Sequence, residues 1–131
     1  MSAQRPKISV GCLVSALLSG SGPDRALDAL LHLLVTGRAS PSEGLCPMAA
    51  ARMSLGRKPP SYTAEAGPVL GAARTKGIIT AVGRNTRSTW ASMWLPAPHG
   101  DHPLIMFAED QPRAAAAALA ESFRLLGATR A

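Results

Sequence analysis

Aromatic side chains are scarce in this chain of 131 residues, at 4% of the composition, although 47% of its residues are apolar. A core with few rings must be built from Leu, Ala, Val, Ile and Met, and such a core favours packed helices over a large sheet. The chain is long enough to bury a core and falls within the usual size of one domain. We therefore expect a single, mostly helical domain over residues 1–131.

Cysteine is also scarce, and Cys12 and Cys46 have neither CxxC spacing nor a histidine in ligand register. This pattern predicts no zinc site or redox pair, so we expect buried thiols in a reducing compartment and a cytoplasmic chain. One alternative is a short secretory signal, because Arg5 and Lys7 precede an apolar stretch, but Gly11 interrupts that stretch and no A-x-A cleavage site follows. The stretch is too short to span a bilayer, and we expect no membrane partner.

Signatures of catalysis and of cofactor binding are missing. No GxxxxGKS or GxGxxG run is present, so the sequence predicts no nucleotide cofactor. The segment from Lys76 onward superficially resembles the last strands and helix of penicillin-recognising serine hydrolases, but it carries TKG in place of KTG, and the chain has no S-x-x-K nucleophile. His99, Asp101 and His102 could ligate a metal, although adjacent loop residues of these types more often form a polar turn. We expect no enzyme, no cofactor and no metal.

Positive charge is what the sequence does have, and it is unevenly placed. The formal net charge is +6, and the segment from Arg52 to Arg87 holds seven basic residues against one acid, Glu65. Basic and acidic residues balance in the remainder of the chain. Cations gathered in one segment suggest a partner with regularly spaced negative charge, for which nucleic acid is the usual candidate.

Hydrophobic spacing and helix-stop residues predict the order of the elements. Helices are expected at 8–18, 23–36, 47–55, about 68–76 and 110–126. The runs "IITAV" and "TWASMWL" predict an antiparallel hairpin with the polar tip "GRNTRS", and "LIMFA" a further short strand.

The run "VLGAARTKGIITAVGR" resembles the end of the recognition helix and the first wing strand of bacterial winged-helix regulators. In those proteins a helix Leu, a capping Gly, two aliphatic residues and a Gly-Arg wing recur, and the matching positions here are Leu70, Gly77, Ile78, Ile79, Gly83 and Arg84. The resemblance implies a winged helix-turn-helix over 23–95, which is mainly α with a small antiparallel β-hairpin (α+β). Residues 96–131 would add a short strand and a C-terminal helix that packs on the core or pairs with its copy in a homodimer. One departure is that Gly67 and Pro68 fall where the middle of the recognition helix is expected.

This resemblance and the confined charge predict a transcriptional regulator that contacts double-stranded DNA through a helix-turn-helix and a basic wing. The expected contacts are of three kinds: cations for phosphates, hydroxyls for base edges, and polar side chains at the hairpin tip for the minor groove or the backbone. In that order they are Arg57, Lys58, Arg74 and Lys76; Ser61, Tyr62 and Thr63; and Arg84, Asn85 and Arg87.

Two alternatives stay open. The chain could be a non-enzymatic protein-interaction module or inhibitor, whose basic hairpin docks on an acidic protein surface. Trp90 and Trp94 lie on one side of the second expected strand, where they could stack on single-stranded nucleic acid, although large rings in a chain poor in aromatics more often cover the core or a dimer contact.

Overall fold

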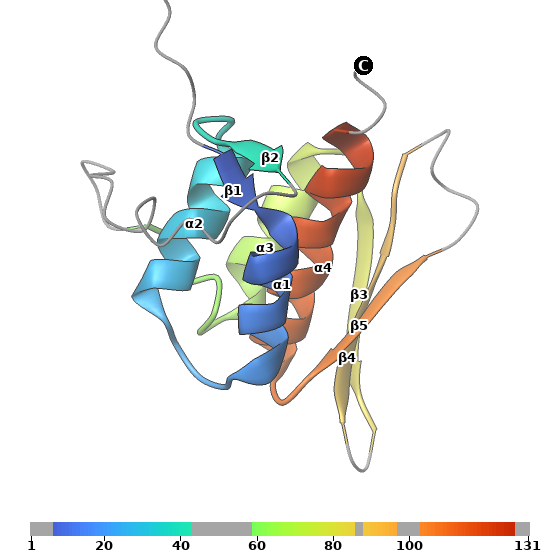
Figure 1. Ribbon diagram of the computed structural model, residues 1–131. Coiled ribbons are helices and arrows are strands. Elements are labelled where there is room, and N and C mark those ends of the chain that lie inside the picture. Colours follow the sequence, from blue (N-terminus) through green and yellow to red (C-terminus); the bar gives the residue numbers. More distant parts are fainter. Residues whose placement is uncertain (1–6, 43–58, 86–87, 97–102, 128–131) are drawn as a thin grey trace, which may run out of the picture.

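Four helices and two small sheets form the part of the chain that the computed structural model describes, residues 7–42, 59–85, 88–96 and 103–127 (Figure 1). In chain order the elements are β1 (Lys7–Ser9), α1 (Val10–Ser19), α2 (Arg25–Val35), β2 (Ser40–Ser42), α3 (Ala66–Thr75), β3 (Ile79–Arg84), β4 (Thr89–Trp94), β5 (Leu104–Ala108) and α4 (Gln111–Gly127). β1 and β2 form a parallel pair, and β3, β4 and β5 form an antiparallel sheet in that spatial order.

The first two helices begin at side-chain caps. Ser9 Oγ accepts a hydrogen bond from the Cys12 N–H at 3.3 Å, and Asp24 Oδ1 accepts one from the Leu27 N–H at 3.1 Å. Such caps satisfy backbone donors that have no partner within the helix. Both expected helices are confirmed. Leu13 and Leu17 of α1 are buried, so this apolar stretch forms part of the core.

Helix α4 is the centre of the fold. It lies between the three-stranded sheet and the helices α1 and α3 (Figure 1), and every residue from 113 to 120 is buried. Its five consecutive alanines allow close approach on all sides, because a methyl group adds little to the radius of a helix. The predicted helix is confirmed, and its residues 113–120 pack within the fold of one chain.

A buried arginine joins α4 to the turn between α1 and α2. Arg113 donates from Nε to the Gly22 carbonyl at 3.0 Å, from Nη1 to the Ala16 carbonyl at 3.1 Å, and from Nη2 to the Ser21 carbonyl at 3.3 Å. A guanidinium has five N–H donors in a planar fork, so one side chain can hold several carbonyls together. Segments more than ninety residues apart in sequence are thereby tied together.

The expected fold class, a mainly α winged helix-turn-helix (α+β) with only a small β-hairpin, is wrong in its strand content. The fold is α+β, but β5 pairs with β4 through five residues and a parallel β1–β2 pair is also present, so the strands amount to more than a hairpin. The scarcity of aromatic residues misled the prediction: only one face of this sheet packs on helices, and aliphatic and methionine side chains such as Val82, Ala91, Met93 and Met106 fill that face without aromatic rings.

Several individual elements of that prediction are nevertheless confirmed. The hairpin is confirmed as β3 and β4, and the helix expected at about 68–76 is α3. α3 directs Val69 and Ala73 into the core. The helix expected at 47–55 lies outside the described residues.

Candidate binding face on the sheet

The three-stranded sheet has one face packed on helices and one face that none of the described elements covers (Figure 1). Side chains alternate between the two faces along each strand. We call the uncovered side the outer face. Its residues are Ile79, Ala81, Gly83, Trp90, Ser92, Trp94, Ile105 and Phe107.

Large apolar side chains are exposed on the outer face. The exposed fraction is 72% for Ile79, 43% for Trp94, 52% for Ile105 and 56% for Phe107. By contrast Met93, which points to the other face of β4, is fully buried. Monomeric soluble proteins rarely expose contiguous apolar patches, so this face marks a candidate interaction site.

Cross-strand pairing places large apolar side chains next to each other at both ends of the outer face. Ile79 pairs with Trp94 at one end, and Phe107 pairs with Trp90 at the other. The half-buried Trp90 indole lies over Gly83, since a Cβ added to this glycine would clash with the Trp90 ring. Gly83 therefore sets the orientation of an aromatic ring, which is a role beyond that of a turn residue.

Positive charge gathers along the β3 side of the outer face. Arg74 and Lys76 lie just before β3, Arg84 ends it, and all three are exposed. At the far side of the sheet the exposed charge that follows β5 is acidic Glu109. The outer face is therefore apolar, and exposed cations lie at both ends of its β3 edge.

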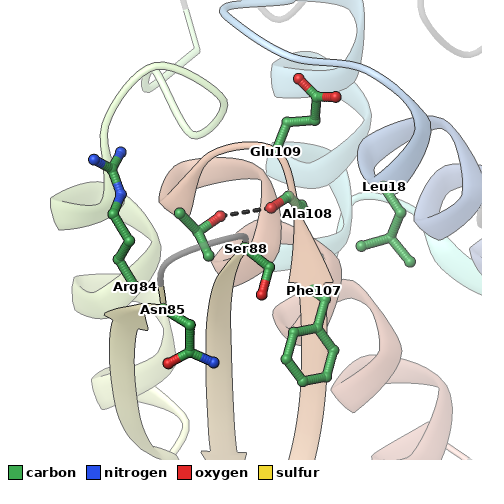
Figure 2. A pocket seen from close by; sticks show the side chains of 8 residues that line it. Leu18, Arg84, Asn85, Ser88, Phe107, Ala108 and Glu109 are labelled. Carbon is green, nitrogen blue, oxygen red and sulfur yellow. Dashed lines mark hydrogen bonds between the residues drawn. The ribbon is translucent and has the colours of Figure 1, made fainter.

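A shallow cavity of about 620 Å³ lies at the hairpin end of the sheet (Figure 2). It is lined by Leu18, Arg84, Asn85, Ser88, Thr89, Phe107, Ala108 and Glu109. The Thr89 hydroxyl donates to the Ala108 carbonyl at 2.6 Å, so it is engaged within the fold. The Arg84 and Glu109 side chains do not converge on a common point, and the cavity thus lacks the cluster of polar groups that orients a small ligand.

Two of the expected DNA-reading residues lie in the interior. Thr63 is fully buried, and its N–H and its hydroxyl both donate to Asp28 Oδ1 at 2.8 Å. The hydroxyl of buried Tyr62 hydrogen-bonds His32 Nδ1 at 2.9 Å. Burial, followed by the nearby Asp28 charge, raises the pKa of Tyr62 to about 12, whereas burial and then Arg38 lower the pKa of His32. The hydroxyls of Tyr62 and Thr63 therefore hold their segment against α2.

The other expected contact residues lie apart from this pair. Ser61 is half-buried beside Tyr62, whereas Arg74, Lys76, Arg84 and Asn85 are exposed around β3. Arg57, Lys58 and Arg87 lie outside the described residues. The structure thus places Arg74 and Lys76 before the start of β3 and Arg84 and Asn85 at its other end, and it gathers neither these residues nor the three hydroxyls into one site.

The cysteine expectation needs correction. Cys12 is half-buried and disulfide-bonded rather than a buried thiol, and Cys46 lies outside the described residues. Spacing between cysteines carries no information on pairing, because long-range folding decides which thiols meet.

Neither metal ligands nor a membrane span is found in the described ranges. No group of three or more His, Cys, Asp and Glu residues there could hold a metal ion, and His99, Asp101 and His102 lie outside those ranges. No described helix has both the length and the apolar character needed to cross a membrane.

Sequence reasoning missed Ile105 and Phe107 as surface residues. The run "LIMFA" is apolar at every position, so it lacks the polar alternation that marks a strand with one exposed face. Alternate side chains of a strand point to opposite faces, so a run that is apolar throughout places apolar side chains on both faces of the sheet. This was the available signal. Comparisons of the chain with models of protein families, with characterised proteins and with solved structures found no match.

Proposed function

We propose that this chain is a non-enzymatic protein-interaction module that binds an acidic protein partner through the outer face. The observation that carries the proposal is the group of four large apolar side chains, Ile79, Trp94, Ile105 and Phe107, exposed on a sheet face that no described element covers. Full burial of a side chain of this size contributes about 1.5–3 kcal/mol, and because these four are already partly covered, each contributes roughly half of that before the costs of association.

The charge of the partner follows from the border of the outer face. Arg74, Lys76 and Arg84 are exposed along β3, and the whole chain carries a formal net charge of +6. Complementary charge at the rim of an apolar patch speeds encounter and rejects partners of like charge. An acidic protein surface with an apolar centre fits both features.

The test is capture from a cell extract treated with nuclease, with the retained proteins identified by mass spectrometry. We expect an acidic protein whose yield falls about tenfold when Ile105→Ser and Phe107→Ser are combined, because two buried anchors are lost. Ala26→Ser, on the exposed surface of α2, is the control and keeps the partner. Equal capture by the double variant would contradict the proposal.

Duplex DNA is the second candidate partner, favoured by the exposed cations Arg74, Lys76 and Arg84 around β3. Phosphate binding by such cations weakens steeply with salt, because counterions are released from the DNA. Fluorescence anisotropy with a random-sequence duplex across a salt series, with the Arg84→Ala/Arg87→Ala double variant alongside, tests it. A steep slope that flattens in the variant would support DNA binding, and no binding at low salt would remove it.

The compartment is a separate proposal. The sequence alone favours the cytoplasm, but disulfides persist where the surroundings are oxidising, so the bond at Cys12 favours an oxidising compartment. Alkylation of the protein under non-reducing conditions, followed by mass spectrometry, tests this point. Alkylation of Cys12 in the native protein would show a free thiol, which would favour the cytoplasm instead.

A further inference from the structure

We infer that the segment of the partner that this module recognises is an extended acidic peptide, which pairs with the free edge of β3 as a fourth strand. This inference rests on the proposed function and adds a binding mode to it. Strand addition obtains its affinity from main-chain hydrogen bonds and its specificity from alternate side chains.

The edge of β3 is open in the described part of the chain. β3 is the first strand of the β3-β4-β5 sheet, and no described strand pairs with its other side. The Asn85 N–H donates to the Ser88 carbonyl at 2.7 Å, which makes these two residues a hydrogen-bonded pair of the hairpin. Such pairs alternate along an antiparallel ladder. The main-chain groups of Thr80, Val82 and Arg84 therefore point away from β4, toward the open edge.

The start of this edge also has room for a side chain of the added strand. A cavity of about 440 Å³ lies between α3 and β3, lined by Leu70, Arg74, Gly77, Ile78, Ile79 and Thr80. The Thr80 hydroxyl is buried and has no hydrogen-bond partner among the described residues. A buried hydroxyl without a partner is costly. A carboxylate from the added strand can pair with the exposed Arg74 at this cavity.

The charges on β3 argue against a second copy of this chain as the added strand. Antiparallel pairing of two β3 strands would bring the Arg84 end of one copy to the Lys76 end of the other, and parallel pairing would place like ends together. Both arrangements set cations side by side, which is how many proteins prevent pairing between their own sheet edges. An acidic strand reverses the sign of that interaction.

The side chains of the added strand would alternate in the same way as those of β3. One set would continue the outer face beside Ile79 and Ala81, and the other would point toward Arg74 and Arg84. Apolar residues suit the first set and acidic residues the second. The simplest probe is thus a peptide of about eight residues that alternates valine and glutamate.

The experiment measures binding of this labelled peptide to the full chain by fluorescence anisotropy, with Val82→Pro and Val82→Ala compared. Both variants lose the valine side chain, but only proline removes the N–H that faces the open edge. We expect Val82→Pro to bind about threefold to tenfold more weakly than Val82→Ala. Circular dichroism checks that both variants fold.

Peptides methylated on alternate main-chain nitrogens give a second measurement on the unchanged protein. Methylation of the amides that face β3 should abolish binding, and methylation of the other set should leave it unchanged. Equal binding by the two methylated peptides, or by a peptide with lysine in place of glutamate, would overturn the inference. Binding of duplex DNA without binding of the acidic peptide would overturn it as well.

The edge inference and the proposed function fail in different ways. If Ile105→Ser with Phe107→Ser abolishes partner capture while Val82→Pro matches Val82→Ala, the partner uses the outer face without strand addition. If the Ile105→Ser/Phe107→Ser variant captures the partner as well as the unchanged protein does, the proposed function is contradicted.

Discussion

The two sides of this molecule reverse the usual distribution of polar and apolar groups. On the sheet side, Ile105 and Phe107 are exposed, while on the α2 side Asp28 and Thr63 are buried against each other. Exposed apolar patches and buried polar groups are the informative departures from the rule that apolar residues are inside. Here the exposed apolar patch is the candidate interaction surface, and the buried pair holds the segment around Thr63 to α2.

The difference lies in whether each group has a partner within the fold. Asp28 Oδ1 accepts two hydrogen bonds from Thr63, and the Asp24 N–H donates to the Thr63 hydroxyl at 2.7 Å. These polar groups are satisfied by each other. The apolar side chains of the outer face have no such neighbour above them among the described elements. Variants on the two sides should therefore affect different properties.

The largest effect is expected at the buried polar side. Asp28→Ala would leave the Thr63 N–H and hydroxyl without their shared acceptor, so it should lower the free energy of unfolding by about 3 kcal/mol. Urea denaturation monitored by circular dichroism measures this loss. The exposed acid Glu109 provides a control, because Glu109→Ala should change stability by less than about 0.5 kcal/mol.

A smaller effect is expected where the outer face is most closely packed. Gly83→Ala would place a methyl group against the Trp90 ring, so the ring must move, and stability should fall by about 1–2 kcal/mol. With Trp94→Phe as background, the emission of Trp90 should shift to longer wavelength. Gly71→Ala in α3 has open space around the added methyl and should be neutral or stabilising. An unchanged emission spectrum for Gly83→Ala would mean that the ring does not rest on the glycine.

The buried side should also show a distinct response to alkaline pH. Tyr62 is the only tyrosine of the chain, so absorbance near 295 nm reports its ionisation alone. Its pKa is raised to about 12, above the usual 10, so the neutral form is favoured in the folded state. The contribution of Tyr62 to stability is complete below pH 10 and is lost as the pH rises toward 12. A native titration midpoint at 10 would contradict burial of this hydroxyl.

The smallest change in stability is expected on the outer face. Ile105→Ser combined with Phe107→Ser should alter the free energy of unfolding by less than about 0.5 kcal/mol per site, because these side chains are already exposed. The same variant should bind less of a hydrophobic dye such as ANS. A large loss of stability would show that the two side chains are packed within the fold. That result would contradict the difference between the two sides of the molecule.

Local signals predicted the elements well. Capping residues and helical spacing predicted α1, α2 and α4, and β-branched runs with a polar tip predicted β3 and β4. These signals act over a few residues, so the sequence displays them directly. The pairing of β5 with β4 and of β1 with β2 depends on contacts between distant segments, which local patterns do not contain.

The candidate site was harder to predict for the same reason. Thr63 was expected at the surface because its hydroxyl can bind DNA, but its partner Asp28 lies 35 residues earlier in the chain. Trp94 was favoured as cover for the core or for a dimer contact, and its exposure on the outer face shows that it does not cover the core. Arg74, Lys76 and Arg84 were predicted as contact residues, and all three are exposed. The binding experiments proposed above distinguish contacts with DNA from contacts with a protein.

The central position of α4 has a consequence for synthesis on the ribosome. Every other described element precedes α4 in the chain, yet the sheet and the helices α1 and α3 all pack on it. The nascent chain thus emerges with its interior incomplete, and contacts such as Arg113 to Ala16, 97 residues apart, form only after α4 has been synthesised. Proteins that depend on such distant contacts fold slowly and expose apolar surface until those contacts have formed. During translation, chaperones would therefore meet both faces of the sheet uncovered.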